Sequence, residues 1–125
     1  MNTGETFFWE TTKAKGYKLR PKYHIFICRT DSSNNVFLFI SKDGRDGDYK
    51  ITKPPYSFLL LPESFISCSS VVRYTDAQLK TASPLPEGSL SKEHLLELFF
   101  QIANSFTMEA GHIKLVCEAL SAVCA

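Results

Sequence analysis

The sequence predicts an α+β domain in which a strand-rich part precedes two helices. Residues 1–80 hold short β-prone segments separated by polar turns, and residues 91–125 hold apolar side chains at helical spacing. Residues 81–90, rich in Pro and Gly, form a connector between the two parts. With 125 residues the chain has the length of one domain, spanning 1–125.

Composition excludes several classes of protein. Charged residues make up 22% and hydrophobic residues 44% of the chain, which favours a packed core over disorder. No apolar run approaches the ~20 residues of a membrane helix, and we expect no contact with a membrane. The first residues show neither a basic flank nor an apolar segment, so we expect no signal peptide and a cytoplasmic location. The four cysteines form no C-x-x-C pair, so we expect plain thiols, no metal site and no cofactor.

The first strands are expected at residues 6–9, 23–28 and 36–40. The second of them alternates strictly, as a half-buried strand does. One of its faces carries Tyr23, Ile25 and Ile27, and the other carries His24, Phe26 and Cys28. Residues 36–40 are almost continuously apolar, which suits a strand that is covered on both sides. The polar cluster at 31–35 predicts a hairpin between the second and third strands.

Further short strands are expected at residues 49–52, 58–61, 64–66 and 71–74. Pro54 and Pro55 end the first of these, because proline cannot donate to a strand ladder. Short strands this close together predict either a small barrel or a sandwich.

The helical tail begins after the connector. Ser91 is a good N-cap, and Leu90 can pack on Leu95 as a hydrophobic staple. The apolar stripe of the first helix is Leu95, Leu98, Phe99 and Ile102. Residues 104–105 break the helical pattern, and Thr107 is a candidate cap for a second helix. The apolar stripe of that second helix is Ile113, Val116, Cys117 and Leu120.

The net charge of +1 hides an asymmetry between residues 1–50, at +3, and residues 51–125, at −2. Residues 13–29 contain six cations and no acid: Lys13, Lys15, Lys18, Lys22, Arg20 and Arg29. Tyr17 and Tyr23 lie among them. Such a run attracts polyanions, and interleaved aromatic rings can stack on unpaired bases. The alternative is a solvated basic loop with no partner.

The chain lacks the motifs of several enzyme classes, since it has neither a G-x-S-x-G elbow nor a glycine-rich phosphate loop. Cleavage of RNA without a metal needs no nucleophile from the protein, because the ribose 2′-hydroxyl is the nucleophile. The candidates for such chemistry are Arg20, His24, Ser41, Arg73 and Asp76. For His24 the alternative is a satisfied, buried histidine. For Arg73 and Asp76 the alternative is an ion pair at the surface.

The order of the first segments of the chain is similar to that of a known protein family. Residues 4–9 read Gly-Glu-Thr-Phe-Phe-Trp, a basic loop follows, and residues 20–27 read Arg-Pro-Lys-Tyr-His-Ile-Phe-Ile. This resembles the MazF/PemK family of toxin endoribonucleases, which opens with a Gly-acid pair and continues to an Arg-Pro pair and an apolar strand. The family's next strand ends in Thr. Here residues 36–40 match that strand, and Ser41 stands at the Thr position.

A second segment resembles a divergent PemK-like branch of that family. Phe65 and Ile66 are followed by residues 70–77, Ser-Val-Val-Arg-Tyr-Thr-Asp-Ala, at the spacing found in that branch. The likeness extends from Gly4 to about Leu79 and includes the helical tail.

The resemblance implies an SH3-like β-barrel followed by two C-terminal helices. It also implies metal-free cleavage of single-stranded RNA, an antitoxin protein as partner, and a possible homodimer. Arg20 then matches the family's functional arginine, and Ser41 matches its hydroxyl position. We expect Arg20 to stabilise the phosphorane and Ser41 to orient the phosphate, while His24 or Asp76 moves protons. The expected RNA-binding residues are Lys15, Tyr17, Lys18 and Lys22.

Two departures from the family keep a second function open. Gly16 is followed by Tyr17, Lys18 and Leu19, where the family often has an acid, and Ser64 stands where the divergent branch often has His. Each loss removes a candidate for proton transfer. The alternative is therefore a non-catalytic barrel that binds protein or RNA.

Overall fold

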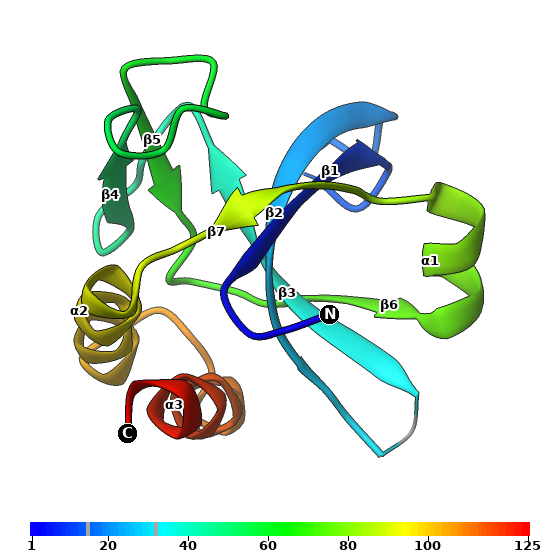
Figure 1. Cartoon of the computed structure of the whole chain (residues 1–125). Helices are drawn as coiled ribbons and strands as arrows, with labels where there is room; N and C mark the ends of the chain where they lie inside the picture. The colour runs from blue at the N-terminus through cyan, green and yellow to red at the C-terminus, as the bar shows by residue number, and fades with distance from the viewer. Residues whose placement is uncertain (15, 32) are drawn as a thin grey trace.

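The computed structural model describes residues 1–14, 16–31 and 33–125. Its strands are β1 (Glu5–Thr11), β2 (Arg20–Arg29), β3 (Asn34–Ser41), β4 (Tyr49–Thr52), β5 (Glu63–Ile66), β6 (Val72–Thr75) and β7 (Leu85–Ser89). Its helices are α1 (Asp76–Ala82), α2 (Lys92–Ala103) and α3 (Ala110–Cys124). The strands form one curled antiparallel sheet in the order β4-β5-β3-β2-β1-β7, and β6 also pairs with β3 (Figure 1). The α+β class expected from the sequence is confirmed.

The sheet is built around the β2–β3 hairpin, which the sequence predicts. Tyr23 pairs with Ile40 and Phe26 with Phe37, and the register shifts between Phe26 and Cys28. Because successive side chains on a strand point to opposite faces, each strand of the hairpin contributes side chains to two separate hydrophobic cores. The shift turns Cys28, expected to share a face with Phe26, toward the core that contains Ile25 and Ile27.

Helices α2 and α3 cover one face of the sheet. Leu98, Ile102, Val116 and Leu120 are fully buried against it, as the predicted helical stripes require. Ser91 caps α2 as expected, since its hydroxyl accepts from the His94 N–H. In Figure 1 the two helices lie together beside the sheet, while α1 lies apart from them.

The opposite face carries a smaller aromatic core. Its buried members are Phe7, Trp9, Phe26, Phe37, Val72 and Tyr74. The strands β1, β2, β3 and β6 contribute these side chains, and the curl of the sheet closes around them. Leu79 of α1 packs against the same group.

Two expectations about the later strands are wrong. Residues 58–61 form turns and bends instead of a strand, because Pro54, Pro55 and Pro62 remove donors on both sides of the segment. The segment instead inserts Leu59 into the larger core. The expected connector at 81–90 contains β7, whose side chains are all exposed and which pairs with β1 at the edge of the sheet.

Two expectations about the helices also need correction. The sequence patterns did not predict α1. The described residues therefore form three helices instead of two, and only the last two belong to the C-terminal tail. Thr75 and Gln78 form a capping box at the start of α1. The last helix begins at Ala110 and not after Thr107, because the Ser105 hydroxyl already accepts the N–H groups of Thr107 and Met108.

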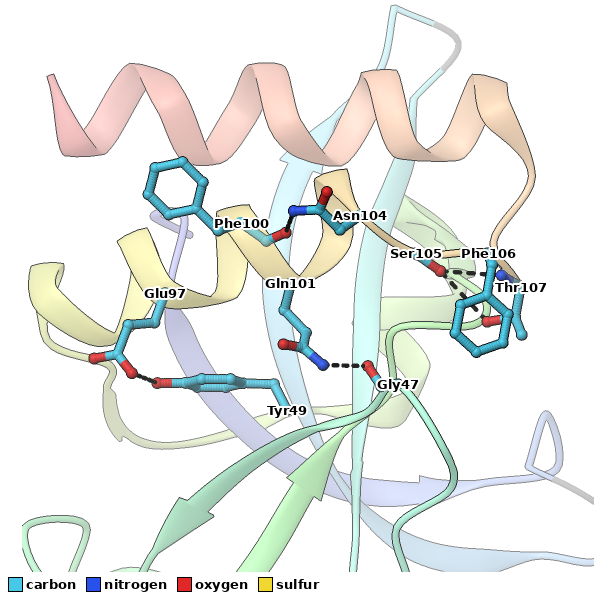
Figure 2. A pocket seen from close by; sticks show the side chains of 9 residues that line it. All are labelled: Gly47, Tyr49, Glu97, Phe100, Gln101, Asn104, Ser105, Phe106 and Thr107. Atoms are coloured by element: carbon cyan, nitrogen blue, oxygen red, sulfur yellow. Dashed lines mark hydrogen bonds between the residues drawn. The ribbon is translucent and has the colours of Figure 1, made fainter.

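Polar contacts fix α2 to the segment around β4 (Figure 2). The Gln101 side-chain amide donates to the Gly47 carbonyl at 2.9 Å, and the Tyr49 hydroxyl donates to Glu97 at 3.2 Å. These bonds join the helical layer to the edge of the sheet farthest from β7. No helix in the described part of the chain combines the length and apolar character needed to cross a membrane.

Replacing Leu98 by Ala should lower the free energy of unfolding by about 2–5 kcal/mol, because this fully buried side chain would leave a cavity between α2 and the sheet. The matched control is Leu96→Ala on the exposed side of the same helix, expected to change that free energy by no more than about 0.5 kcal/mol. Urea denaturation followed by circular dichroism measures both. Equal losses for the two variants would contradict the assignment of the buried face.

Candidate functional site

Antiparallel pairing of β2 with β3 brings two of the expected site residues together. Tyr23 pairs with Ile40, so Lys22 lies opposite Ser41 at the same end of the hairpin. The Lys22 ammonium donates to the Ser41 hydroxyl oxygen at 2.8 Å. Arg20 lies two residues further along the same face of β2.

These residues line an open hollow of about 580 Å³, which we call the basic hollow. Its walls come from residues 13–14 after β1, the β2–β3 hairpin, the β3–β4 loop and the serines at positions 67, 69 and 70. No residue of α1, α2 or α3 in the described part of the chain lines it. The helices therefore leave this hollow open.

The hollow carries an excess of positive charge. Among the described residues, five of those that line it are cations: Lys13, Arg20, Lys22, Lys42 and Arg45. Two of the described lining residues are acids, Asp43 and Asp48. The Asp48 carboxylate is engaged by the backbone, because its two oxygens accept from the N–H groups of Cys68 and Arg45. The remaining balance favours an anionic ligand.

Arg20 is exposed at the entry to β2, where it is close to the loop that precedes it. A Cβ atom at Gly16 would come within 3.3 Å of its Nη2 atom. Gly16 also has φ +89°, a conformation that side-chain-bearing residues rarely adopt. Glycine at this position therefore lets the backbone approach the guanidinium.

Lys22 has an unusual environment for a lysine. Burial lowers its pKa, and the charge of Arg20 lowers it further, while Asp43 acts in the opposite direction. Its ammonium also lies 5.5 Å from the centroid of the Phe39 ring. Compared with an ordinary surface lysine, Lys22 gives up its proton more easily.

His24 is fully buried and cannot reach a ligand in the hollow. Its Nδ1 lies 3.1 Å from the Lys22 carbonyl oxygen, which only accepts, so Nδ1 carries the hydrogen. Nε2 then accepts from the Tyr74 hydroxyl at 2.8 Å, and that hydroxyl accepts from Thr11 at 2.7 Å. The His24 ring stacks on Trp9 with centroids 3.5 Å apart. Burial lowers the pKa of His24 to about 3, so the ring is neutral near pH 7.

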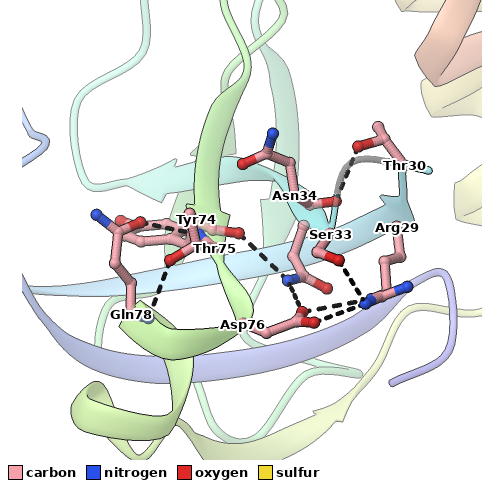
Figure 3. Close-up of polar contacts among 9 residues, drawn as sticks. Arg29, Thr30, Ser33, Asn34, Tyr74, Thr75, Asp76 and Gln78 are labelled. Atoms are coloured by element: carbon pink, nitrogen blue, oxygen red, sulfur yellow. Dashed lines mark hydrogen bonds and ion pairs between the residues drawn. The ribbon is translucent and has the colours of Figure 1, made fainter.

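Asp76 belongs to a different cluster, at the start of α1 (Figure 3). Its carboxylate accepts from Arg29 at 2.6 Å and from the Asn35 amide at 2.8 Å. The Arg29 guanidinium also donates to the Ser33 hydroxyl at 3.1 Å. The hydrogen bond from Arg29 lowers the pKa of Asp76 to about 2. The pairing of Asp76 with Arg73, left open by the sequence, is wrong: Arg29 is the partner.

The structure does not bring the other expected residues to the basic hollow. Arg73 is exposed on β6 between Val72 and Tyr74, so it points away from the aromatic core that both neighbours enter. Tyr17 and Lys18 are exposed on the loop before Arg20 and do not line the hollow. Lys15 lies outside the described residues.

Several lining residues were missed by sequence reasoning. Lys42 and Arg45 directly follow the β3 residue Ser41, and this second group of cations was a usable signal. The serines at positions 67, 69 and 70 reach the hollow only because β5 pairs with the end of β3. No local pattern marks them.

The cysteines and acids offer little for metal binding. Within residues 1–14, 16–31 and 33–125, no group of three or more His, Cys, Asp or Glu side chains is placed to hold a metal ion. Burial raises the pKa of Cys68 to about 12 and also raises the pKa values of Cys28 and Cys117, so these thiols stay protonated near pH 7.

Neither a scan against protein-family models nor a search of curated proteins finds a match to this chain.

The buried state of His24 predicts a pH-dependent contribution to stability. Its pKa of about 3 in the folded chain lies below the 6.5 of an exposed histidine, so the unfolded chain binds the extra proton between these values. Stability from this group is therefore lost as the pH falls from 6.5 toward 3, by up to about 1.4 kcal/mol per pH unit. We expect wild type to lose its advantage over His24→Gln across this window. Urea denaturation at a series of pH values measures it, and a constant difference would contradict the burial.

Proposed function

We propose that this chain is a PemK-like, SH3-like barrel that binds single-stranded RNA in the basic hollow and cleaves it without a metal ion. The observation that carries the proposal is the meeting of Arg20, Lys22 and Ser41 around one open hollow with excess positive charge. The family resemblance singles out Arg20 and Ser41 independently of their position in space. A toxin role follows from the same resemblance.

Binding would use the phosphate backbone of the RNA. The Arg20 guanidinium suits two phosphate oxygens at once, and Lys13, Lys42 and Arg45 add charge along the walls. Tyr17, with 85% of its surface exposed, offers a ring for base stacking on the loop before Arg20. Affinity of this kind falls as salt rises, because cations on the protein replace counterions on the RNA.

Cleavage would proceed by attack of the ribose 2′-oxygen on the adjacent phosphorus. The neutral form of Lys22 takes the 2′-hydroxyl proton, and its lowered pKa increases the fraction in that form. Arg20 stabilises the charge on the pentacoordinate phosphorus, and Ser41 donates its hydroxyl hydrogen to a phosphate oxygen. The P–O5′ bond breaks, water supplies a proton to the leaving oxygen, and the products carry a 2′,3′-cyclic phosphate and a 5′-hydroxyl.

A second candidate is a barrel that binds RNA without cleaving it. The observation that favours it is the position of the two expected proton carriers, since His24 is buried and Asp76 is paired with Arg29. Lys22, expected from the sequence only to bind RNA, is then the lining residue whose lowered pKa favours a neutral, proton-accepting form. The two candidates share the binding step and differ in the role of Lys22.

An antitoxin that occupies the basic hollow would exclude RNA, and a homodimer would place two such hollows in one particle. These partners are proposed from the resemblance.

Expression of the chain should slow cell growth, and expression of Arg20→Ala should not. Equal growth of the two cultures would count against the toxin role.

RNA binding should weaken when a hollow cation is removed. We expect Arg20→Ala to reduce the slope of log affinity against log salt by about 0.7, because one phosphate contact is lost from a single strand. Lys114→Ala removes the same charge from the exposed side of α3, outside the hollow, and should leave the slope unchanged. Fluorescence anisotropy with a mixed-sequence RNA at several salt concentrations measures this. Identical slopes for both variants would place binding elsewhere.

Cleavage should depend on the proton affinity of residue 22. Lys22→Arg keeps the positive charge but cannot act as a base near neutral pH, so it should bind RNA with nearly wild-type affinity and lose cleavage by at least about 100-fold. Gel analysis of RNA incubated with the protein in chelator, with end-group detection of cyclic phosphate, measures the loss. Binding by wild type with no cleavage would favour the non-catalytic candidate, and cleavage by Lys22→Arg at the wild-type rate would remove Lys22 as the base.

A further inference from the structure

A second hollow, of about 400 Å³, lies between α2 and the segment around β4 (Figure 2). We call it the α2 pocket. Its walls are the second half of α2, residues 104–107, Gly47 and Tyr49. None of the described residues lines both this pocket and the basic hollow, and the volume of the pocket lies in the range of small-ligand sites.

Two phenylalanines that line the α2 pocket are exposed, and their side chains belong to neither hydrophobic core. Phe100 is 56% exposed and Phe106 is 80% exposed, and Figure 2 shows them at opposite ends of the pocket. The buried face of α2 is already formed by Leu95, Leu98 and Ile102. Exposed aromatic rings beside a hollow mark a surface that gains free energy when a ligand covers it.

The polar groups of the α2 pocket present hydrogen-bond acceptors. Gln101 donates from its amide nitrogen to the Gly47 carbonyl, and no described residue donates to its amide oxygen. Glu97 accepts from Tyr49 through Oε1, and no described residue donates to its Oε2 atom. A ligand with several N–H donors would satisfy both oxygens.

The α2 pocket also carries unpaired negative charge. Among the described residues, no cation lies within ion-pair distance of Glu97 or Glu93. Burial raises the pKa of Tyr49, and the charges of Glu97 and Glu93 raise it further, so both carboxylates add negative potential at the Tyr49 hydroxyl. The complementary ligand is therefore a cation and not an anion.

We propose that the α2 pocket docks an arginine side chain of a protein partner. The guanidinium has five N–H donors and no acceptor, so it can bind Glu97 and the Gln101 oxygen together. Its flat face can stack on an aromatic ring, and apolar residues beside the arginine can cover Phe100 and Phe106. The two rings lie at opposite ends of the pocket in Figure 2, which favours a peptide segment over free arginine.

This docking is independent of RNA binding, because no described residue lines both hollows. Variants at Arg20 or Lys22 should leave it unchanged. Failure of either proposal therefore leaves the other standing.

The test uses the full chain, labelled with ¹⁵N, and three probes in an NMR titration. The probes are acetyl-Leu-Arg-Leu-amide, the same tripeptide with citrulline in place of arginine, and free L-arginine. We expect the arginine peptide to shift the amide signals of Tyr49, Glu97, Gln101 and Phe106, with a Kd of roughly 1 mM. Citrulline has the same shape without the charge and should bind at least about tenfold more weakly.

A matched pair of variants tests the role of the carboxylate. Glu97→Gln should weaken the arginine peptide about tenfold, while Glu118→Gln on the exposed side of α3 should not change its affinity. Both should keep the amide spectrum of a folded chain. Equal binding of the citrulline peptide, unchanged affinity in Glu97→Gln, or no shift at these residues up to about 10 mM peptide would overturn the proposal. Free arginine binding as tightly as the peptide would overturn the assignment to a protein partner.

Discussion

The pairing of β2 with β3 is the constraint on which the rest of the structure depends. Each of these strands supplies both cores: Ile25 and Leu38 face α2 and α3, and Phe26 and Phe37 face the aromatic core. A slip of one residue in this pairing would exchange the two faces, turning His24 and Phe26 toward α2 and α3 and turning Ile25 and Ile27 toward the aromatic core. The same register places Lys22 opposite Ser41. Fold and candidate site are therefore fixed by one set of backbone hydrogen bonds.

The basic hollow lies where the side chains on the aromatic face of β2 change from buried and aromatic to exposed and positively charged. Along that face the side chains run from Phe26 through His24 to Lys22 and Arg20, and they pass from buried to exposed. His24 occupies the boundary: its ring is packed on Trp9, and its Nδ1 hydrogen holds the Lys22 carbonyl. A neutral, buried histidine thus holds the backbone of a lysine that lines the hollow. His24 acts as a support for the site and has no contact with a ligand.

Sequence reasoning succeeded where the pattern was local. Alternation predicted the β2–β3 hairpin, helical spacing and Ser91 predicted α2, and the motif around Arg20 and Ser41 predicted two residues that line one hollow. Features that depend on pairing between distant parts of the chain were not predicted. The extended segment at 85–89 becomes a strand only because β1 has a free edge, and Asp76 finds Arg29 only because β6 pairs with β3. Those contacts join residues far apart in the chain, and no short motif records them.

The two hollows have opposite chemistry and are separated by the loop between β3 and β4. This loop gives Lys42 and Arg45 to the basic hollow and Gly47 to the α2 pocket. It is held from both sides, because Gln101 binds the Gly47 carbonyl and Asp48 binds the Cys68 and Arg45 N–H groups. Two ligands influence each other only when one of them changes a contact that the other needs. The Gln101 amide oxygen can accept from an arginine while the amide nitrogen keeps its bond to the Gly47 carbonyl, so docking in the α2 pocket would leave the loop that carries Lys42 and Arg45 in place.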